Sequence, residues 1–103
     1  MDFHGLRIIE GELMGAEIPI MPDESIIVGR DANECNLVLR DGTVSRKHLL
    51  IDCDESGQYY VTDYSKTGTI VDGGDRVHIG SRTPITSGTV LIIGMAGTKI
   101  ILT

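Results

Sequence analysis

No stretch of this chain has the 3.6-residue periodicity that an amphipathic helix needs. Short runs rich in isoleucine, leucine and valine are instead separated by glycine, proline, aspartate, asparagine and serine. Many short strands at close spacing predict an all-β fold, a sandwich or barrel of about eleven mostly antiparallel strands. The expected strands are 4–10, 17–21, 25–29, 36–39, 47–53, 58–63, 69–72, 75–79, 83–86, 89–93 and 98–102.

Turn residues between these runs predict how the strands connect. Residues 54–57 and 72–75 combine glycine with aspartate, which is typical of tight turns because glycine tolerates positive φ. Residues 94–97 lie between the last two expected strands and predict a terminal hairpin. Between these turns the pattern alternates, so that Tyr59 and Val61 are expected on the same face of one strand.

Composition limits the classes of protein to which the chain can belong. Its 103 residues suffice for one domain with one core, so we expect a single domain over 1–103, either alone or cut from a longer protein. Hydrophobic residues make up 41% of the chain, which argues against disorder. The net charge of −6 argues against a nucleic-acid partner, because such binders carry a basic face.

The sequence also predicts the state of the two cysteines and the cellular compartment. Cys35 and Cys53 fit no metal-ligand spacing, and Cys53 shares a strand face with Leu49 and Ile51. A buried free thiol is therefore favoured, and a disulfide between the two cysteines is the alternative. No signal peptide or apolar run of about 20 residues is present, so we expect a cytoplasmic protein without direct membrane insertion.

Three polar patches lie where an expected strand meets a loop: Gly29–Arg30, Ser45–His48 and Ser65–Thr69. They combine guanidinium, ammonium and hydroxyl donors with turn glycines. Donors on loops of a rigid scaffold suit the capture of an anion such as phosphate. Five of the nine basic residues belong to or adjoin these patches, namely Arg30, Arg40, Arg46, Lys47 and Lys66. A local positive pocket on an acidic chain would select a single phosphate group while repelling polyanions.

Catalytic and cofactor functions find little support in the same residues. Ser45 as nucleophile with His48 as base is the enzymatic alternative, but no oxyanion motif and no orienting acid accompany the pair. His48 is better explained as a residue that bonds loop backbone and fixes the turn at Ser45. The loop around Lys66 lacks the Walker A pattern, and the three histidines lack metal-ligand partners. We therefore expect no enzyme, no cofactor and no metal.

The order of the patches resembles the forkhead-associated (FHA) domain family. Gly29–Arg30, the Ser-Arg-x-His motif at residues 45–48 and the run Asp63–Thr69 match its signatures, over about residues 26–79 and more weakly to the C-terminus. The resemblance implies an eleven-stranded β-sandwich that binds phosphothreonine peptides through loops at one end, in Ser/Thr-kinase signalling. The ligand is expected on a separate protein, or elsewhere in the same chain or complex.

The resemblance also assigns roles to individual positions. Contact with phosphate falls on Arg30, Ser45, Arg46 and Lys66, and structural support of the site falls on Gly29, His48, Ser65 and Gly68. The peptide-contacting positions are Thr67 and Asp72, where the family usually has asparagine. Threonine lacks the carboxamide that braces a peptide backbone, so the clamp is expected to be altered. The alternative function is a phosphate-independent scaffold in a larger assembly such as a secretion-system complex.

Overall fold

The computed structural model describes residues 4–74 and 80–103, and within these ranges it contains ten strands and no helix. The strands are β1 (Gly5–Glu10), β2 (Glu17–Pro19), β3 (Ser25–Gly29), β4 (Leu37–Val38), β5 (Leu49–Cys53), β6 (Tyr59–Asp63), β7 (Thr69–Val71), β8 (Thr83–Ile85), β9 (Val90–Ile93) and β10 (Thr98–Leu102). The remaining expected strand, 75–79, lies outside the described residues. In the same ranges, no helix is long and apolar enough to cross a membrane.

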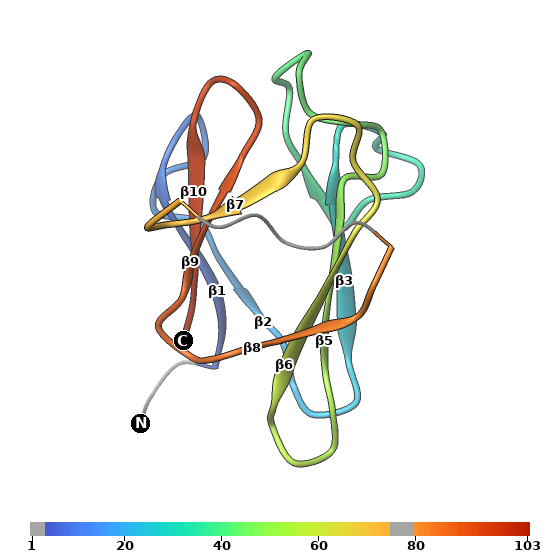
Figure 1. Ribbon diagram of the computed structural model, residues 1–103, viewed down its shortest axis with the longest axis vertical. Helices are drawn as coiled ribbons and strands as arrows, with labels where there is room; N and C mark the ends of the chain where they lie inside the picture. The colour runs from blue at the N-terminus through green and yellow to red at the C-terminus, as the bar shows by residue number, and fades with distance from the viewer. Residues whose placement is uncertain (1–3, 75–79) are drawn as a thin grey trace.

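The strands form two facing five-stranded sheets, which Figure 1 shows as two layers. One sheet has the order β2-β1-β10-β9-β7 and the other the order β4-β3-β5-β6-β8. The described pairs are antiparallel except β3 with β4, which run parallel. The predicted all-β sandwich of mostly antiparallel strands is therefore confirmed.

The predicted hairpins are present, and their turns are stabilised by local hydrogen bonds. Strands β5 and β6 pair across residues 54–57, where the Asp54 carboxylate accepts the backbone N–H groups of Ser56 and Gln58 at 2.9 and 3.0 Å. Strands β9 and β10 pair across residues 94–97. An aspartate that accepts amides two and four residues ahead closes the turn without any partner from elsewhere.

Eight of the ten described strands are shorter than the sequence pattern predicts, and β2, β4 and β5 are each shorter by two residues. Strand β4 covers only Leu37–Val38, and β5 begins at Leu49 rather than at residue 47. The reason at β5 is local, because the backbone N–H of Ser45 donates to the ring of His48 and bends the chain into a turn. Residues 45–48 therefore belong to a loop, and the ladder with β3 starts only at the pair Val28–Leu49.

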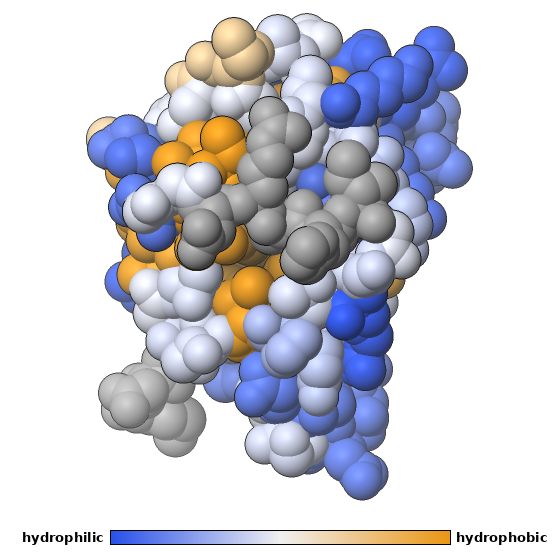
Figure 2. Space-filling model, viewed as in Figure 1, coloured by the Kyte–Doolittle hydropathy of each residue, from blue (hydrophilic) through white to orange (hydrophobic). Residues whose placement is uncertain are grey.

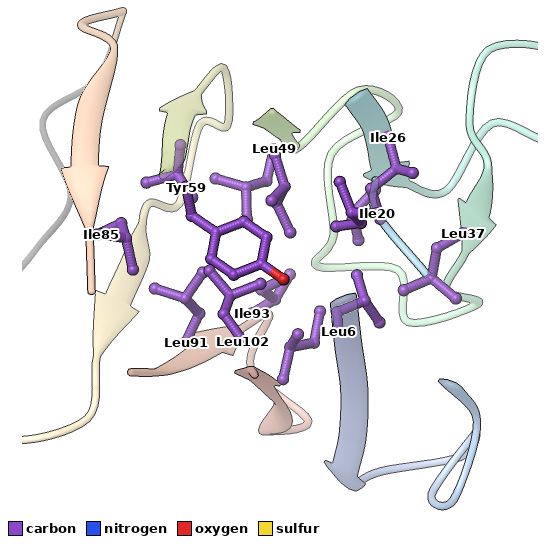
Figure 3. Packing of buried hydrophobic residues seen from close by; sticks show 14 of the residues in the cluster. Leu6, Ile20, Ile26, Leu37, Leu49, Tyr59, Ile85, Leu91, Ile93 and Leu102 are labelled. Atoms are coloured by element: carbon purple, nitrogen blue, oxygen red, sulfur yellow. The ribbon is translucent and has the colours of Figure 1, made fainter. Parts of the chain in front are cut away.

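The core lies between the two sheets and consists of isoleucine, leucine and valine around one aromatic ring. Figure 3 shows Tyr59 at its centre, next to Leu91 and Leu102 of the opposite sheet. The Tyr59 hydroxyl donates to the carbonyl of Thr103 at 3.0 Å, which satisfies its polar end. Val61 is buried with Tyr59 as alternation predicts, and the thiol of Cys53 is buried and free, so the alternative disulfide is not formed.

The loops that carry the three patches meet at one end of the sandwich. In Figure 1 the connections after β3, after β4 and after β6 all lie towards the top. The start of β1 and the end of β10 lie in the lower half, where the N–H of Thr103 donates to the carbonyl of Gly5 at 2.9 Å. The fold therefore brings patches that are distant in sequence to one end of the sandwich. The first and last described strands begin and end away from these patches.

Candidate anion-binding site

An open pocket of about 650 Å³ lies between these loops. It is lined by Arg30, Gly42, Thr43, Val44, Ser45, Arg46, Lys47, Tyr64, Lys66 and Thr67. The pocket brings together the four residues expected to contact phosphate, together with Thr67. Asp72 is not among the lining residues and lies exposed just after β7, where its N–H donates to the carbonyl of Val90. Figure 2 shows hydrophilic residues gathered at the upper right, over the loop end of the second sheet.

Gly29 allows two loops to approach closely. A Cβ at this position would lie 2.3 Å from the carbonyl oxygen of Arg46, so any side chain would push the loop away. Contact with the Arg46 backbone thus explains why residue 29 is a glycine. The family resemblance implies only that this glycine supports the site. The N–H of Arg30 donates to the carbonyls of Ser45 and Arg46, both at 3.1 Å.

The side chain of Arg30 is fixed at one edge of its guanidinium. Its Nε–H donates to the carbonyl of Val44 at 3.1 Å, and the residue is otherwise exposed at the pocket. Fixing the Nε edge orients the terminal amino groups without occupying them. Those amino groups present parallel N–H donors of the kind that bind phosphate or carboxylate oxygens.

His48 is fully buried and supports the turn at Ser45. Its Nδ1 accepts the backbone N–H of Ser45 at 3.1 Å, which assigns the ring proton to Nε2, the donor to the carbonyl of Gly68 at 3.3 Å. Burial lowers the pKa of His48, because the charged imidazolium loses its hydration. The ring thus joins two of the pocket loops in its neutral form.

The hydroxyl of Ser45 remains suited to contact an anion. Its oxygen accepts the backbone N–H of Lys66 at 3.1 Å, and a hydroxyl that accepts one bond retains its own hydrogen for another acceptor. The backbone N–H of Ser45 is in contrast already used by His48. Only the hydroxyl of Ser45 can therefore serve a ligand without disturbing the turn.

The loop after β6 is shaped by the buried carboxylate of Asp63. Its two oxygens accept the N–H groups of Ser65 at 2.8 Å and Thr69 at 2.9 Å. The hydroxyl of Ser65 accepts the N–H of Gly68 at 2.8 Å, and Gly68 has φ of +90°, which favours glycine. These bonds place Lys66 and Thr67 at the tip of the loop, exposed at the pocket.

Thr67 points its hydroxyl into the protein rather than towards a ligand. The hydroxyl donates to the carbonyl of Thr43 at 3.3 Å and joins two pocket loops. The hydroxyl of Thr43 accepts the N–H of Met95 at 2.7 Å, which extends the connection to the β9–β10 turn. The threonine therefore braces the wall of the pocket, and its side chain has no second polar group to offer.

Sequence reasoning missed several lining residues. Tyr64 received no role, although the residue is 44% exposed at the pocket and the centre of its ring lies 4.3 Å from the Nζ of Lys47. The only feature of the sequence that could have indicated a role for Tyr64 is that an aromatic residue stands within a polar loop. Gly42, Thr43 and Val44 contribute through the backbone and the loop path, which a single sequence does not reveal.

Together, the fold and the pocket define a β-sandwich binding domain with an anion site on its loops. Comparison with known proteins then identifies the family. The profile described as "FHA domain" matches residues 26–94, more than half of the chain, so the chain belongs to the FHA domain family. FHA domains are binding modules rather than enzymes.

Individual relatives support this membership. The FHA domain of the CT664 protein of Chlamydia trachomatis superposes with a TM-score of 0.86 at 25% identity, covering 99% of this chain and 97% of that one. The MEK1 FHA domain in complex with the HOP1 pThr318 peptide gives a TM-score of 0.79 at 25% identity, covering 98% and 95%. The meiosis-specific serine/threonine-protein kinase MEK1 of Saccharomyces cerevisiae is 36% identical over 61 residues, which are 54% of this chain but only 12% of the kinase.

Proposed function

We propose that this domain binds phosphothreonine-containing proteins, without catalysis, in Ser/Thr-kinase signalling. The observation that carries the proposal is that Arg30 and Ser45, on separate loops, line one pocket and are linked through their backbones. A guanidinium and a hydroxyl on the same wall can both donate to one tetrahedral dianion. Arg46 and Lys66 add two further donors around the same space.

The relatives support the same ligand. The structure of the MEK1 FHA domain holds a phosphothreonine peptide, and that domain covers nearly the whole of this chain in superposition. The matching residues of this chain include the loops that form the pocket, because the family match begins in β3 and ends after β9. We carry over the ligand class alone, and the flanking sequence of the partner peptide is left to experiment.

A catalytic role for Ser45 is opposed by the hydrogen bonds of His48. The Nδ1 that would act as a base accepts the backbone N–H of Ser45, and the Nε2 proton is directed to Gly68. Because neither nitrogen faces the hydroxyl, the pair lacks the proton transfer that activates a serine nucleophile. We therefore propose that the domain binds its partner without catalysis and without a cofactor.

A phosphate-independent scaffold is the second candidate function, and Thr67 is the observation that favours it. Its hydroxyl is bonded to Thr43 and leaves the peptide without a carboxamide brace. Size-exclusion chromatography with and without phosphopeptide separates the two functions. Assembly that is indifferent to phosphate would support the scaffold.

We further propose the cytoplasm as the compartment, because both thiols are free.

The first prediction concerns Arg30. Isothermal titration with a phosphothreonine peptide and its unphosphorylated twin should show binding to the phosphorylated form only. Arg30→Ala should weaken that binding about 10- to 100-fold, since a hydrogen bond to a charged group is worth about 1.5–3 kcal/mol. Arg40→Ala is the matched control, because Arg40 is exposed and lies outside the pocket lining. Equal affinity for the two peptides would refute the proposed function.

A further inference from the structure

The outer face of one sheet is apolar over three adjacent strands. In β9 and β10, buried residues that point into the core alternate with half-buried residues that point outward. The outward aliphatic residues of β7, β9 and β10 are Ile70, Val90, Ile92 and Ile101. Within the described residues, none of the four belongs to the core cluster or packs against it. Figure 2 shows hydrophobic residues on the left of the molecule, where Figure 1 draws β9 and β10.

An apolar outer face is unusual for an antiparallel sandwich, because such a sheet commonly presents polar side chains to water. The other sheet has charged groups on its outer face, where Arg82 lies 3.6 Å over the Tyr60 ring and pairs with Asp52 at 2.6 Å. On the apolar face, Ile70 is paired with Ile92 and Val90 with Ile101, so the aliphatic side chains are neighbours. Contiguous apolar residues on a surface mark a site of interaction.

The pairing register arranges this face in two rows that cross the strands. Each row has one outward residue from β9, one from β10 and one from β1, in that order. The first row is Ile92, Lys99 and Glu10, and the second is Val90, Ile101 and Arg7. Both rows therefore begin with an aliphatic residue on β9, and they end in opposite charges on β1.

This order makes the face complementary to itself. A two-fold rotation about an axis that crosses the strands exchanges the two rows, strand for strand. Ile92 of one copy would then face Val90 of a second copy, and Glu10 would face Arg7. Lys99 would lie along Ile101 with its aliphatic stem, while its ammonium stays near Glu10, 3.6 Å away within its own chain. A symmetric dimer requires a patch that is complementary to itself in this way.

The charge of the whole chain also favours a second copy as the occupant. The charged groups on this face form two ion pairs, Arg7 with Glu17 and Lys99 with Glu10, and their charges sum to zero. The net charge of −6 therefore belongs to the rest of the chain. Contact through the neutral face keeps most of that charge apart, and a strongly basic or acidic partner would find no excess charge there to attract it.

The size of the face suits a weak dimer. Strands lie about 4.8 Å apart and rise about 3.3 Å per residue, so a sheet of five strands, the longest with six residues, covers roughly 20 Å by 20 Å. Two such faces in contact would bury on the order of 1,000 Å² of accessible surface, which is the lower range for a specific interface. Sheets that pack face to face align within about 30°, which suits the exchange of rows.

We infer that the outer face of the sheet β2-β1-β10-β9-β7 binds a second copy of this chain and forms a two-fold dimer. The loops of the anion pocket lie at one end of the sandwich, away from this face, so both pockets stay open (Figure 1). Because the axis crosses the strands, the two pockets lie at opposite ends of the dimer. The dimer would thus hold two phosphorylated partners at once, a consequence that rests on the proposed function.

Sedimentation velocity over a range of protein concentrations tests the dimer. The wild-type chain should sediment as a monomer when dilute and as a dimer when concentrated. Ile92→Glu should raise the dimer dissociation constant at least about tenfold, because each dimer then buries two carboxylates against aliphatic side chains. Its cross-strand neighbour Lys99 can pair with the new carboxylate, so the monomer should stay folded, which urea denaturation checks.

Leu50→Glu is the matched control. Leu50 is a half-buried aliphatic residue on a central strand, but on the outer face of the other sheet, and its substitution changes the charge equally. It should leave the dimer dissociation constant unchanged. A wild-type chain that remains monomeric throughout, or equal effects of Ile92→Glu and Leu50→Glu, would overturn the inference.

Two charge variants test the exchange of rows. Arg7→Glu alone would place two anions opposite each other at both ends of the interface, and Glu10→Lys alone would place two cations there. A mixture of the two variants restores an anion opposite a cation at both contacts. The mixed dimer should therefore form at least about fivefold more tightly than either variant alone, as expected for two exposed ion pairs. A mixture that associates no better than its components would show that the assigned contact is wrong.

Phosphopeptide binding separates this inference from the proposed function. Saturation with a phosphothreonine peptide should leave the dimer intact, because the pocket lies outside the interface. A monomeric wild-type chain that binds only the phosphorylated peptide overturns the dimer alone. A chain that dimerises but does not distinguish the phosphorylated peptide from its unphosphorylated twin refutes the proposed function and leaves the interface supported.

Discussion

The carbonyl oxygen of Arg46 lies where a side chain at residue 29 would have to be. A Cβ on Gly29 would also meet the thiol sulfur of Cys35 at 2.9 Å, so two neighbours enclose the position. The thiol donates to the same Arg46 carbonyl at 3.0 Å. At the scale of a single residue, the missing side chain permits the contact that aligns the Arg30 and Ser45 loops.

Gly29→Ala should therefore destabilise the protein and weaken phosphopeptide binding. We expect the free energy of unfolding to fall by about 1–3 kcal/mol, because the Arg46 backbone must shift to admit the methyl group. Urea denaturation measures this loss. Gly42→Ala is the control for stability, because a Cβ at Gly42 meets nothing within 4 Å. An equal stability for the two variants would contradict the assigned contact.

Residues whose chemistry is local were the easier ones to predict. Arg30, Ser45 and Lys66 are predicted as donors from the sequence, and they line one pocket in the structure, although their contact with phosphate stays a prediction. Tyr64 could not be assigned, because its significance arises from a lysine on another loop. The hydrogen bond that consumes the Ser45 N–H is likewise visible only once the ring of His48 has been placed.

At the scale of elements, the loop from Asp63 to Thr69 depends on one carboxylate. Two acceptor oxygens satisfy two buried amides, and the amide of Gly68 is satisfied by Ser65. A buried amide without an acceptor costs about 1–3 kcal/mol. The loop therefore presents Lys66 to the pocket in a backbone path that the carboxylate stabilises.

Asp63→Asn should destabilise this loop, because the NH₂ group of asparagine cannot accept a hydrogen bond. One of the two backbone N–H groups, that of Ser65 or that of Thr69, then lacks an acceptor. We expect the free energy of unfolding to fall by about 1–3 kcal/mol, together with weaker phosphopeptide binding. Asp52→Asn is the matched control, since Asp52 pairs with the exposed Arg82 at 2.6 Å, and such a pair contributes less than about 1 kcal/mol. Similar losses in chemical denaturation for both variants would show that the buried carboxylate has no special role.

The sequence predicted element boundaries where a turn is closed by its own residues. The predicted boundary was wrong where a side chain bonds the backbone and interrupts the strand pattern. The turn at 54–57 is closed by Asp54 within the turn itself, and its position was predicted. The start of β5 was placed too early, because alternation continues through residue 47 while His48 bonds the Ser45 backbone and ends the ladder at Leu49. A strand pattern does not reveal that competition.

At the scale of the whole molecule, the pairing of strands that are distant in sequence was not predictable from local patterns. Strand β10 pairs with β1 from the opposite end of the chain, and β7 leaves the sheet of β6 to pair with β9. These pairings close the sandwich around Tyr59, whose hydroxyl reaches the carbonyl of the last residue, Thr103. The sequence predicted the class of fold, the family resemblance and the hairpins β5–β6 and β9–β10, but not these long-range pairings.

Acid should destabilise the whole molecule in two separate ranges of pH. The pKa of His48 is lowered by burial in the folded protein, so below its ordinary value of about 6.5 the unfolded chain binds the extra proton. The free energy of unfolding therefore decreases as pH falls below about 6.5 towards the folded pKa. The pKa values of Asp41 and Asp54 are lowered by hydrogen bonds from Thr43 and Ser56. Their contributions to the free energy of unfolding are therefore lost only below about pH 4.

His48→Asn separates the first range from the second. The variant should be less stable than the wild type at pH 7 by about 1–3 kcal/mol, because the bonds to Ser45 and Gly68 are impaired. Its free energy of unfolding should then change less than that of the wild type between about pH 7 and pH 5, because asparagine binds no proton. Urea denaturation across this range measures both slopes. A variant that keeps the wild-type slope would show that a group other than the buried imidazole makes the fold sensitive to mild acid.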